Sequence, residues 1–486
     1  MLRAEHTDDS RRTTALSDRS TRDGMQMNTP QHDERDRGDD TGAPSGRARP
    51  AGLGALLVAL LVGVAACSNP LDVENPNNLV AGDLNNPQGL TSAVNGALST
   101  TTFAVSDMLA PYAAATDQIE NIGSRDAWRQ LDYGNIANPD NEFTDGAFPS
   151  LGEARYMADK AIRLAREFDE EGTIPNRVDL ARAYFYGSII YASVADMMDD
   201  FVISEPGEGA PAIGPDNMDQ MYQTALDYLE SGLQVAQSEG ASDLVTRMRA
   251  MEARIHFSRG VWNKLNPAGS TPSDPLVDSD EAVQAAQAVL SRVGTQVDWR
   301  YDLQYSSAAV PNSLGGWISN NYITIEEGPV EGGGFVNLDG DDNITEITFT
   351  DPIDTTTAAP EVARVIAEYQ DEPSFASITA LSARELHLIL AESALAEADT
   401  AGFTTHINHV RAMDELTPYS GQIPEMEMLM YSRKANLFLQ GRRLADMYRF
   451  GVEAPYWQDG SAAASQPGTF FPITRTELRA NDNLGG

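Results

Sequence analysis

The sequence predicts a mainly α-helical protein in which tetratricopeptide-like helical hairpins pack against an irregular, loop-rich region. Residues 84–265 and 376–450 repeat apolar side chains at the three- and four-residue spacing of a helix. Residues 266–375 are instead rich in Gly and Pro. Apolar residues make up 41% of the chain, so a sizeable core can be buried. We expect one domain, 84–486, whose C-terminal part, 376–486, is helical again.

The helical spacing is clearest in the segment 178–200, which carries one continuous apolar face and a second apolar side. A helix with two apolar sides is expected to lie between neighbouring helices. Gly187, which costs about 1 kcal/mol of helix propensity, is expected where another element approaches closely. The segments 217–236 and 244–262 repeat the pattern, and paired helices of this length resemble tetratricopeptide hairpins, although no regular repeat can be aligned.

Residues 51–66 form an unbroken apolar run that follows two Arg residues and ends in small residues and Cys67, the single Cys of the chain. The run is shorter than the ~20 residues that span a bilayer but suits the core of a signal peptide. The arrangement resembles the lipobox of bacterial lipoproteins, which implies that residues 1–66 are removed and that acyl chains on Cys67 anchor the protein. Residues 67–83, rich in Asn and Pro, are expected to form an extended tether. A buried helix with an incidental Cys is the alternative.

The charge of the chain is strongly unbalanced, with 72 acidic and 34 basic residues and a net charge of −38. Such a surface repels phosphate backbones, which argues against nucleic-acid binding. The excess of acidic residues favours an adaptation to solubility or salt. The alternative interpretation is that the negative electrostatic field of these residues favours a neutral or cationic ligand.

The residue patterns offer little support for catalysis, since the sequence contains no HExxH, GxSxG or P-loop pattern. His406 and His409 stand three residues apart on an expected helix, but no third ligand is adjacent, so packed histidines are favoured over a zinc site. Asp339, Asp341 and Asn343 alternate oxygen ligands suited to Ca²⁺, yet the Gly and Glu of an EF-hand loop are missing. The alternative is that these three residues form an acidic turn without a bound ion. Apart from this candidate structural calcium we expect no cofactor.

Aromatic residues with polar neighbours in expected loops are the most informative candidates for a binding site. Trp and Tyr rings pack on the apolar faces of sugars, while Asn, Asp and Arg bond to the hydroxyl groups. One cluster lies in the segment 117–133, a second follows Trp317, and a third is Tyr456–Trp457. Each ring taken alone is better explained by core packing, so it is the grouping that indicates a ligand. The candidate ligand-binding residues are Asn121, Arg125, Trp128, Tyr133, Trp317 and Asn320.

A distinctive pattern occupies the C-terminal part of the chain. Residues 441–451 read GRRLADMYRFG, and residues 471–484 contain Phe-Pro-Ile followed by Asn-Asp-Asn-Leu. With segments 391–411 and 181–186, these pieces resemble, in the expected order, the SusD/RagB family of outer-membrane nutrient-uptake lipoproteins. At three positions before Gly441 the family has acidic residues and this chain has uncharged ones. The ion pairs that those acidic residues would make are therefore absent. The replacing residues are Gln440, Asn436 and Ser432.

The resemblance implies a SusD-like fold with four tetratricopeptide-like hairpins on one side and an irregular ligand-facing side. It implies a lipoprotein on the outer face of the outer membrane, which captures oligosaccharides or peptides and passes them to a TonB-dependent, SusC-like transporter without cleaving them. Only the segment around Trp128 falls roughly where a family binding loop lies. We expect a tight turn at one Gly and a buried ion-pair network that includes a pair between Arg443 and Asp446. The residues with these structural roles are Gly441, Arg443, Asp446 and Arg449.

Two other classes of function remain open on the residues alone. A tetratricopeptide-type scaffold lipoprotein that assembles envelope proteins is the alternative. A glycan-active enzyme is a third hypothesis, because two catalytic acids cannot be distinguished among many solvated ones. If the binding hypothesis holds, a Trp128→Ala exchange is expected to weaken glycan binding without unfolding the protein.

Overall fold

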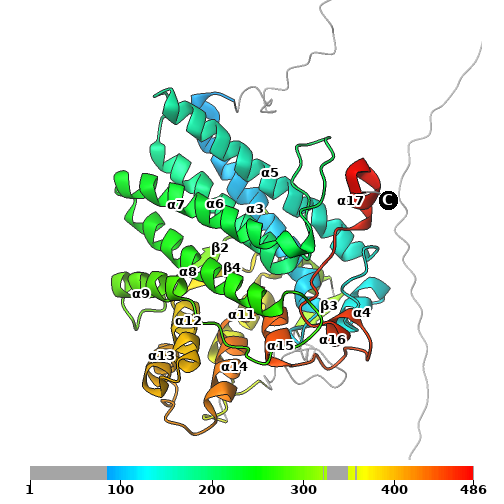
Figure 1. The fold of residues 1–486 in the computed structure, drawn as a ribbon, viewed down its shortest axis with the longest axis vertical. Helices are drawn as coiled ribbons and strands as arrows, with labels where there is room; N and C mark the ends of the chain where they lie inside the picture. The colour runs from blue at the N-terminus through cyan, green and yellow to red at the C-terminus, as the bar shows by residue number, and fades with distance from the viewer. Residues whose placement is uncertain (1–84, 321, 326–348, 356–357, 485–486) are drawn as a thin grey trace, which may run out of the picture. The chain divides into compact units, whose positions relative to one another are not determined.

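The structure is a computed structural model, and α-helices make up most of its described part (Figure 1). Several predictions fall outside the described residues, namely the signal segment, the acylated Cys67, the tether and the candidate calcium ligands Asp339, Asp341 and Asn343. Among the described helices, none is both long enough and apolar enough to cross a bilayer. The described residues are 85–320, 322–325, 349–355 and 358–484.

Long helices build the first half of the described part, as the apolar spacing predicts. The predicted segments 178–200, 217–236 and 244–262 correspond to α6, α7 and α8. Asparagine side chains cap two of the helices: Asn141 accepts hydrogen bonds from the first-turn amides of α5, and Asn176 does so for α6. The elements are η1 (Pro87–Gly89), α3 (Leu90–Ala114), α4 (Asp126–Asp132), α5 (Glu142–Glu170), α6 (Arg177–Met197), η2 (Pro215–Asn217), α7 (Asp219–Ser238) and α8 (Ser242–Leu265).

Helix α6 lies in the middle of this layer and is buried on nearly every side, as its two apolar sides predict. Gly187 shows why the helices can approach so closely. A Cβ atom at this position would lie 2.8 Å from the Tyr228 ring of α7 and 2.9 Å from Ile162 of α5. The missing side chain therefore lets both neighbours pack against the helix, which offsets the lower helix propensity of Gly.

The predicted loop-rich region, 266–375, contains more regular structure than its Gly and Pro content indicates. Three helices within it, α9, α10 and α11, were not predicted, so Trp317 lies on a helix and not in the expected loop. The buried face of α9 has regular helical spacing, but three of its five side chains are Ala and it lies in a region rich in Gly and Pro. The elements of this region are α9 (Asp280–Val293), β2 (Arg300–Leu303), α10 (Ser313–Ser319), β3 (Ile323–Ile325), α11 (Pro360–Asp371) and η3 (Pro373–Phe375).

The C-terminal part is helical, as predicted, but the segment around Gly441 is not one continuous helix. Helix α14 ends at Asn436 and α15 begins at Arg443, and between them Leu439 and Gly441 have φ angles of 52° and 75°. The predicted tight turn at Gly441 is therefore present. The elements are β4 (Ile378–Ser382), α12 (Ala383–Ala396), α13 (Thr400–Met413), α14 (Glu425–Asn436), α15 (Arg443–Phe450), α16 (Ala462–Ser465), α17 (Arg475–Ala480) and η4 (Asp482–Leu484).

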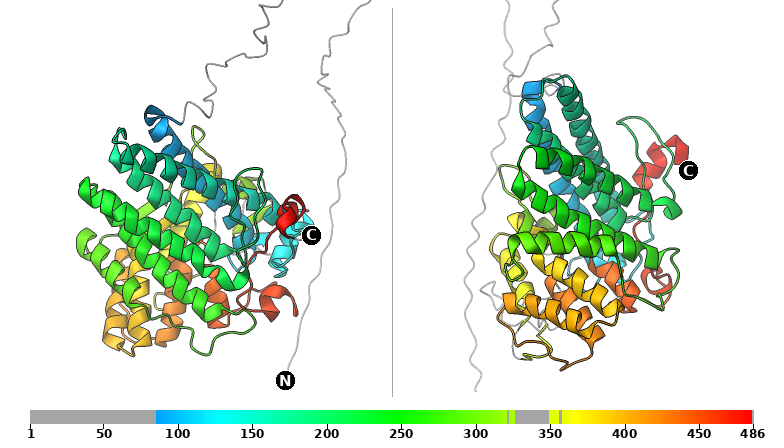
Figure 2. Two further views of the ribbon diagram at one scale, coloured as in Figure 1. Left: turned by 45° about the horizontal axis from the view of Figure 1, so that its top comes forward. Right: turned by 60° about the vertical axis from the view of Figure 1, so that its left-hand side comes forward.

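The long helices pack in four successive pairs, α3 with α5, α6 with α7, α8 with α9, and α12 with α13. Neighbouring pairs touch through α5 and α6, through α7 and α8, and through α9 and α12. Figures 1 and 2 show the resulting array, with the shorter elements α4, β3, α16 and α17 gathered at one side of it. This arrangement agrees with the four hairpins and the irregular side that the family resemblance implies.

Two small antiparallel sheets connect segments that are far apart in the sequence. Strand β1 (Ile119–Asn121) pairs with β3, so that Ile119 lies opposite Ile325 and Asn121 opposite Ile323. Strand β2 pairs with β4 and contains a register shift between Tyr301 and Asp302. The first sheet matters for function because it joins the segment that follows α3 to the segment that follows α10.

A network of buried charges joins α12, α14 and α15. Arg449 forms a bidentate ion pair with Glu392 and donates from Nε to Asp446 at 2.9 Å, and both Arg449 and Glu392 are fully buried. Arg433 donates to the other Asp446 oxygen at 2.9 Å. The Phe257 ring lies 4.8 and 5.6 Å from the guanidinium carbons of Arg433 and Arg449. Burial opposes ionisation of Asp446, but the two arginines outweigh it and lower its pKa.

One detail of the predicted network is wrong. Arg443 does not pair with Asp446, although the two residues are one helical turn apart. It pairs instead with Asp117, 326 residues away in the sequence, through bonds of 2.7 and 2.6 Å. Helical spacing makes a local pair feasible, but Asp446 is already bonded to Arg433 and Arg449.

Candidate ligand-binding site

The pairing of β1 with β3 brings together two of the predicted aromatic clusters. Trp128 of α4 and Trp317 of α10 lie with their ring centroids 5.5 Å apart in an edge-to-face arrangement. Phe143, at the start of α5, stacks on Trp128 at 3.7 Å and contacts Trp317 at 5.0 Å. Tyr322 adds a fourth ring, 5.6 Å from Trp317. The two segments therefore form one aromatic cluster.

Arg125 covers the outer side of this cluster. Its guanidinium carbon lies 5.5 Å from the Phe143 ring and 5.7 Å from the Tyr322 ring, within the range of cation–π attraction. Its Nε donates to Glu142 at 2.9 Å, and both side chains are substantially exposed. The arrangement presents a charged, planar donor group beside half-buried Tyr322 and Trp317.

Trp128 is a core residue and not a platform for a ligand, which corrects the sequence-based interpretation. It lies on helix α4 instead of in a loop, and it is fully buried. Phe143 covers one face of the indole, so a sugar ring cannot stack there. Helix α4 has only seven residues, too few to show a helical pattern in the sequence. The burial of Trp128 depends on Phe143 and Trp317, which come from other segments of the chain.

The remaining predicted residues have mixed surroundings. Asn121 lies on β1 and is half-buried, and Tyr133, also half-buried, ends helix α4. Asn320 is exposed at the end of α10, where its side-chain amide donates to the Gly316 carbonyl at 2.7 Å. Asn320 therefore has a local structural role, while Arg125 and Trp317 stay candidates for ligand contact.

An open hollow of about 540 Å³ lies on the other side of α4. Its polar lining consists of Gln130, Asn135 and Asn138, and Ala137 and Ala462 complete it. Asn138 donates to Gln130 Oε1 at 3.1 Å, and Gln130 donates to Asp126 at 2.9 Å. These bonds hold two amide groups in place while leaving further donor and acceptor positions for a ligand. Amide side chains at a hollow of this size suit a ligand rich in hydroxyl groups.

The third predicted aromatic cluster also meets this region. The backbone N–H of Gln458 donates to the Tyr133 carbonyl at 3.1 Å, so the segment with Tyr456 lies against the end of α4. Trp457 donates from Nε1 to the Ala115 carbonyl at 3.0 Å and is held in place, whereas Tyr456 is 39% exposed. All three aromatic clusters therefore surround helix α4.

Two buried carboxyl groups lie beneath α4. Asp132 accepts a hydrogen bond from the Asn121 backbone N–H at 2.9 Å. Burial raises its pKa to about 8, and the neighbouring charge of Glu120 acts in the same direction. Burial also raises the pKa of Glu120. Asp132 Oδ1 and Glu120 Oε2 have no hydrogen-bond partner among the described residues.

An ion pair from the C-terminal pattern anchors this region. Asp117 lies two residues before the start of β1, and it binds Arg443 through two bonds and Lys434 at 3.2 Å. Burial would raise the pKa of Asp117, but the hydrogen bonds and charges of Arg443 and Lys434 outweigh it and lower the pKa to about 2. Arg443 therefore determines where the segment leading into α4 lies.

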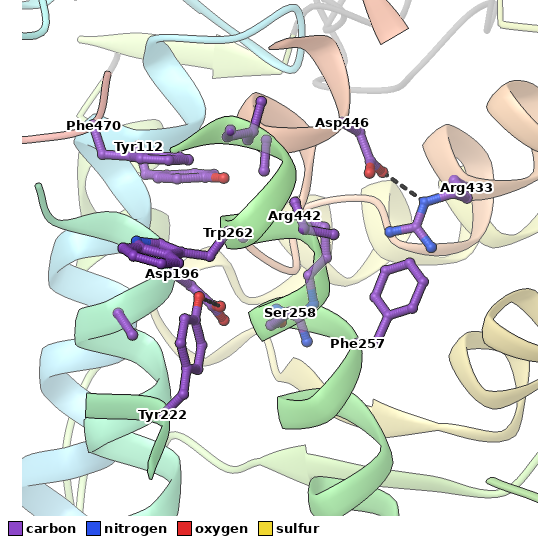
Figure 3. Close-up of a pocket in the computed structure, with 15 residues that line it drawn as sticks. Tyr112, Asp196, Tyr222, Phe257, Ser258, Trp262, Arg433, Arg442, Asp446 and Phe470 are labelled. Atoms are coloured by element: carbon purple, nitrogen blue, oxygen red, sulfur yellow. Dashed lines mark hydrogen bonds and ion pairs between the residues drawn. The ribbon is translucent and has the colours of Figure 1, made fainter. Parts of the chain in front are cut away.

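A small interior cavity adjoins the same pattern (Figure 3). Its volume is about 30 Å³, enough for roughly one or two water molecules and far too small for a nutrient oligomer. Gly441, Arg442 and Asp446 contribute to its wall. Asp196, on the opposite side, accepts hydrogen bonds from Tyr222 at 2.8 Å and Arg254 at 2.6 Å. The cavity is part of the polar core.

The two histidines considered for zinc binding belong to a packed trio. His387, which the sequence does not connect with them, lies with its ring 4.8 Å from His409 and with its Nδ1 atom 3.1 Å from Nδ1 of His406. His387 Nε2 lies 2.8 Å from the Thr295 carbonyl and so carries the proton. Burial lowers the pKa of His387 and His406 to about 4. No group of metal-ligand side chains with a metal-binding arrangement occurs in the described part of the chain.

Comparison with known proteins identifies the fold. No protein-family model and no curated protein matches the sequence. A SusD superfamily protein from Bacteroides thetaiotaomicron has a TM-score of 0.56 at 12% identity, over 82% of this chain and 98% of its own. One from Bacteroides fragilis has 0.56 at 13%, over 82% and 99%. A structure described as a putative sugar binding protein from Bacteroides vulgatus has 0.54 at 13%, over 82% and 97%. The chain therefore has the SusD fold.

Several residues of the site were missed by sequence reasoning. Phe143 and Tyr322 close the aromatic cluster, and Gln130, Asn135 and Asn138 line the hollow. The only sequence signal here is the run of Asn residues in 135–141, which is typical of turns. It predicts an irregular segment but does not indicate a binding surface. The neighbours of α4 come from segments that only the folded chain brings together.

We expect Trp128→Ala to destabilise the protein by about 3–5 kcal/mol, because it removes a fully buried ring and leaves a cavity between Phe143 and Trp317. Urea unfolding measures the loss. Val297→Ala, at a side chain that is 50% exposed, is the control and is expected to change stability little. A Trp128→Ala protein as stable as wild type would contradict the placement of this ring in the core.

Proposed function

We propose that this chain is a cell-surface binding lipoprotein that captures nutrient oligosaccharides and delivers them to a TonB-dependent outer-membrane transporter. The observation that carries the proposal is the amide-lined hollow beside the aromatic cluster, on the irregular side of the SusD fold. Structural neighbours described as a putative sugar binding protein and a SusD-like carbohydrate binding protein support the ligand class.

The ligand chemistry follows from the two sides of α4. Gln130, Asn135 and Asn138 offer neutral donors and acceptors to sugar hydroxyl groups. Tyr322 and Tyr456 offer aromatic edges or faces to the C–H surface of a sugar ring. The hollow is open, so an extended oligomer can lie across it with both ends in solvent. Affinity then comes from several modest contacts spread over the oligomer.

The proposal is binding without cleavage. Hydrolysis of a glycosidic bond requires two carboxyl groups that flank the bond. Glu120 and Asp132 are the neighbouring carboxyl pair at this site, but both are buried, at 7% exposure each, and neither lines the hollow. Their position suits a structural role under α4.

Exchange of Gln130 and Asn138 for Ala is expected to weaken oligosaccharide binding roughly 10-fold, because each lost hydrogen bond is worth about 0.5–1.5 kcal/mol. A glycan array with wild-type protein selects the oligosaccharide, and calorimetry then measures its affinity for both proteins. Gln223→Ala, at an exposed amide on α7, is the matched control. An unchanged affinity in the double variant, or an array that binds nothing, would contradict the proposed site.

The delivery step and the anchor need a separate experiment in native membranes. Wild-type protein extracted from outer membranes in mild detergent is expected to co-purify with a large β-barrel and to carry acyl chains on Cys67. Cys67→Ala is expected to abolish the membrane association. Mass spectrometry of the mature N-terminus identifies the modification. An unmodified thiol, or retention of soluble envelope proteins instead of a barrel, would contradict this part of the proposal and favour a scaffold.

A further inference from the structure

A second, separate cavity lies between α5, the segment 201–209 and α17. Its volume is about 570 Å³, within the range of small-molecule and peptide sites. Figures 1 and 2 show α17 and the loop between α6 and α7 beside α5, away from α14 and α15. The apolar part of its lining is formed by Phe148, Pro149, Tyr156, Met157, Phe201 and Val202.

Hydrogen bonds hold the three walls in place. Arg155 of α5 donates from Nη2 to the Ser204 carbonyl. Asn481 donates to the Ala210 carbonyl at 2.8 Å, and the Thr476 backbone N–H donates to Asp145 at 2.8 Å. The loop is thus tied to α5 on one side and to the C-terminal segment on the other. A cavity whose walls are fixed in this way loses little entropy when a ligand binds.

The charged groups around the cavity are predominantly acidic. Glu153 and Glu208 are exposed at its edge and Glu477 is half-buried, and none of the three forms an ion pair with a described Lys or Arg. Glu205, a fourth acid, approaches Arg163 only at 3.9 Å. Glu153, Glu208 and Glu477 therefore give the edge a negative field, because none of these three carboxylates is in direct contact with a described cation.

The single basic residue of the lining is already neutralised. Arg155 is buried and pairs with Asp159 at 3.1 Å, and Asp159 also accepts hydrogen bonds from Tyr191 and Tyr228. The Nε atom of Arg155 has no hydrogen-bond partner among the described residues. The wall thus contains one N–H donor that a carbonyl oxygen would satisfy.

We propose that this cavity binds short basic peptides, in which Lys or Arg alternates with an apolar residue. The apolar side chain packs against the half-buried Tyr156 and Met157, while the cationic groups meet Glu153, Glu208 and Glu477. A neutral sugar fits this cavity poorly, because its lining offers no cluster of side-chain amides like that at α4. The site is independent of the proposed oligosaccharide site, which lies on a different set of residues.

The experiment uses two acetylated and amidated tetrapeptides, Lys-Leu-Lys-Phe and Glu-Leu-Glu-Phe, with calorimetry on the full mature chain. The basic peptide is expected to bind and the acidic one not. The triple variant E153Q/E208Q/E477Q is expected to bind the basic peptide at least 10-fold more weakly. The matched control is E167Q/E171Q/E230Q, which changes the net charge equally at exposed glutamates outside the cavity and is expected to leave the affinity unchanged.

A second variant tests the cavity itself. Ser204→Trp retains the carbonyl that accepts from Arg155 but places a large ring in the cavity, so peptide binding is expected to be lost while oligosaccharide binding is retained. The proposal is overturned if both peptides bind equally, or if the two triple variants lose affinity equally. It is also overturned if Ser204→Trp leaves peptide affinity unchanged. Oligosaccharide binding, measured on the same proteins, reports separately on the site at α4.

Discussion

The buried ion pair between Asp117 and Arg443 connects the two halves of this structure. Asp117 lies between α3 and β1, and Arg443 begins α15, so the pair ties the start of the binding region to the C-terminal helices. Removing Arg443 leaves Lys434 as the remaining ion-pair partner of the buried Asp117 carboxylate, which is far more unfavourable than losing a surface ion pair. Everything that follows Asp117, from β1 through α4, depends on this attachment.

The C-terminal pattern, residues 441–451, has a structural role. Arg449, Glu392, Asp446 and Arg433 form a continuous buried network around Phe257, and the turn at Gly441 lets α15 approach α3 and α6. Two ligand-sized cavities lie elsewhere, one at α4 and one beside α17. The buried charges thus stabilise the helical array, and the two cavities that we propose as binding sites lie beside its shorter elements.

Sequence periodicity was sufficient for the long helices, because α6, α7 and α8 each present a continuous apolar face. It was insufficient for α9, which lies in a region rich in Gly and Pro, and for α4, which is only two turns long. The three aromatic clusters that the sequence groups come together around α4, where we propose the binding site. The role of Trp128 was not predictable, because its burial depends on Phe143 and on the pairing of β1 with β3.

Hydrogen–deuterium exchange of an Arg443→Met protein tests the central claim most directly. The account predicts that amides in residues 117–133 exchange at least 10-fold faster than in wild type, while amides of α6 and α7 keep their protection. Arg166→Met, which breaks an exposed pair with Glu170 at 3.8 Å, is the control and is expected to change neither region. Unchanged exchange in residues 117–133, or a uniform increase in all helices, would contradict the claim that this ion pair positions the binding region.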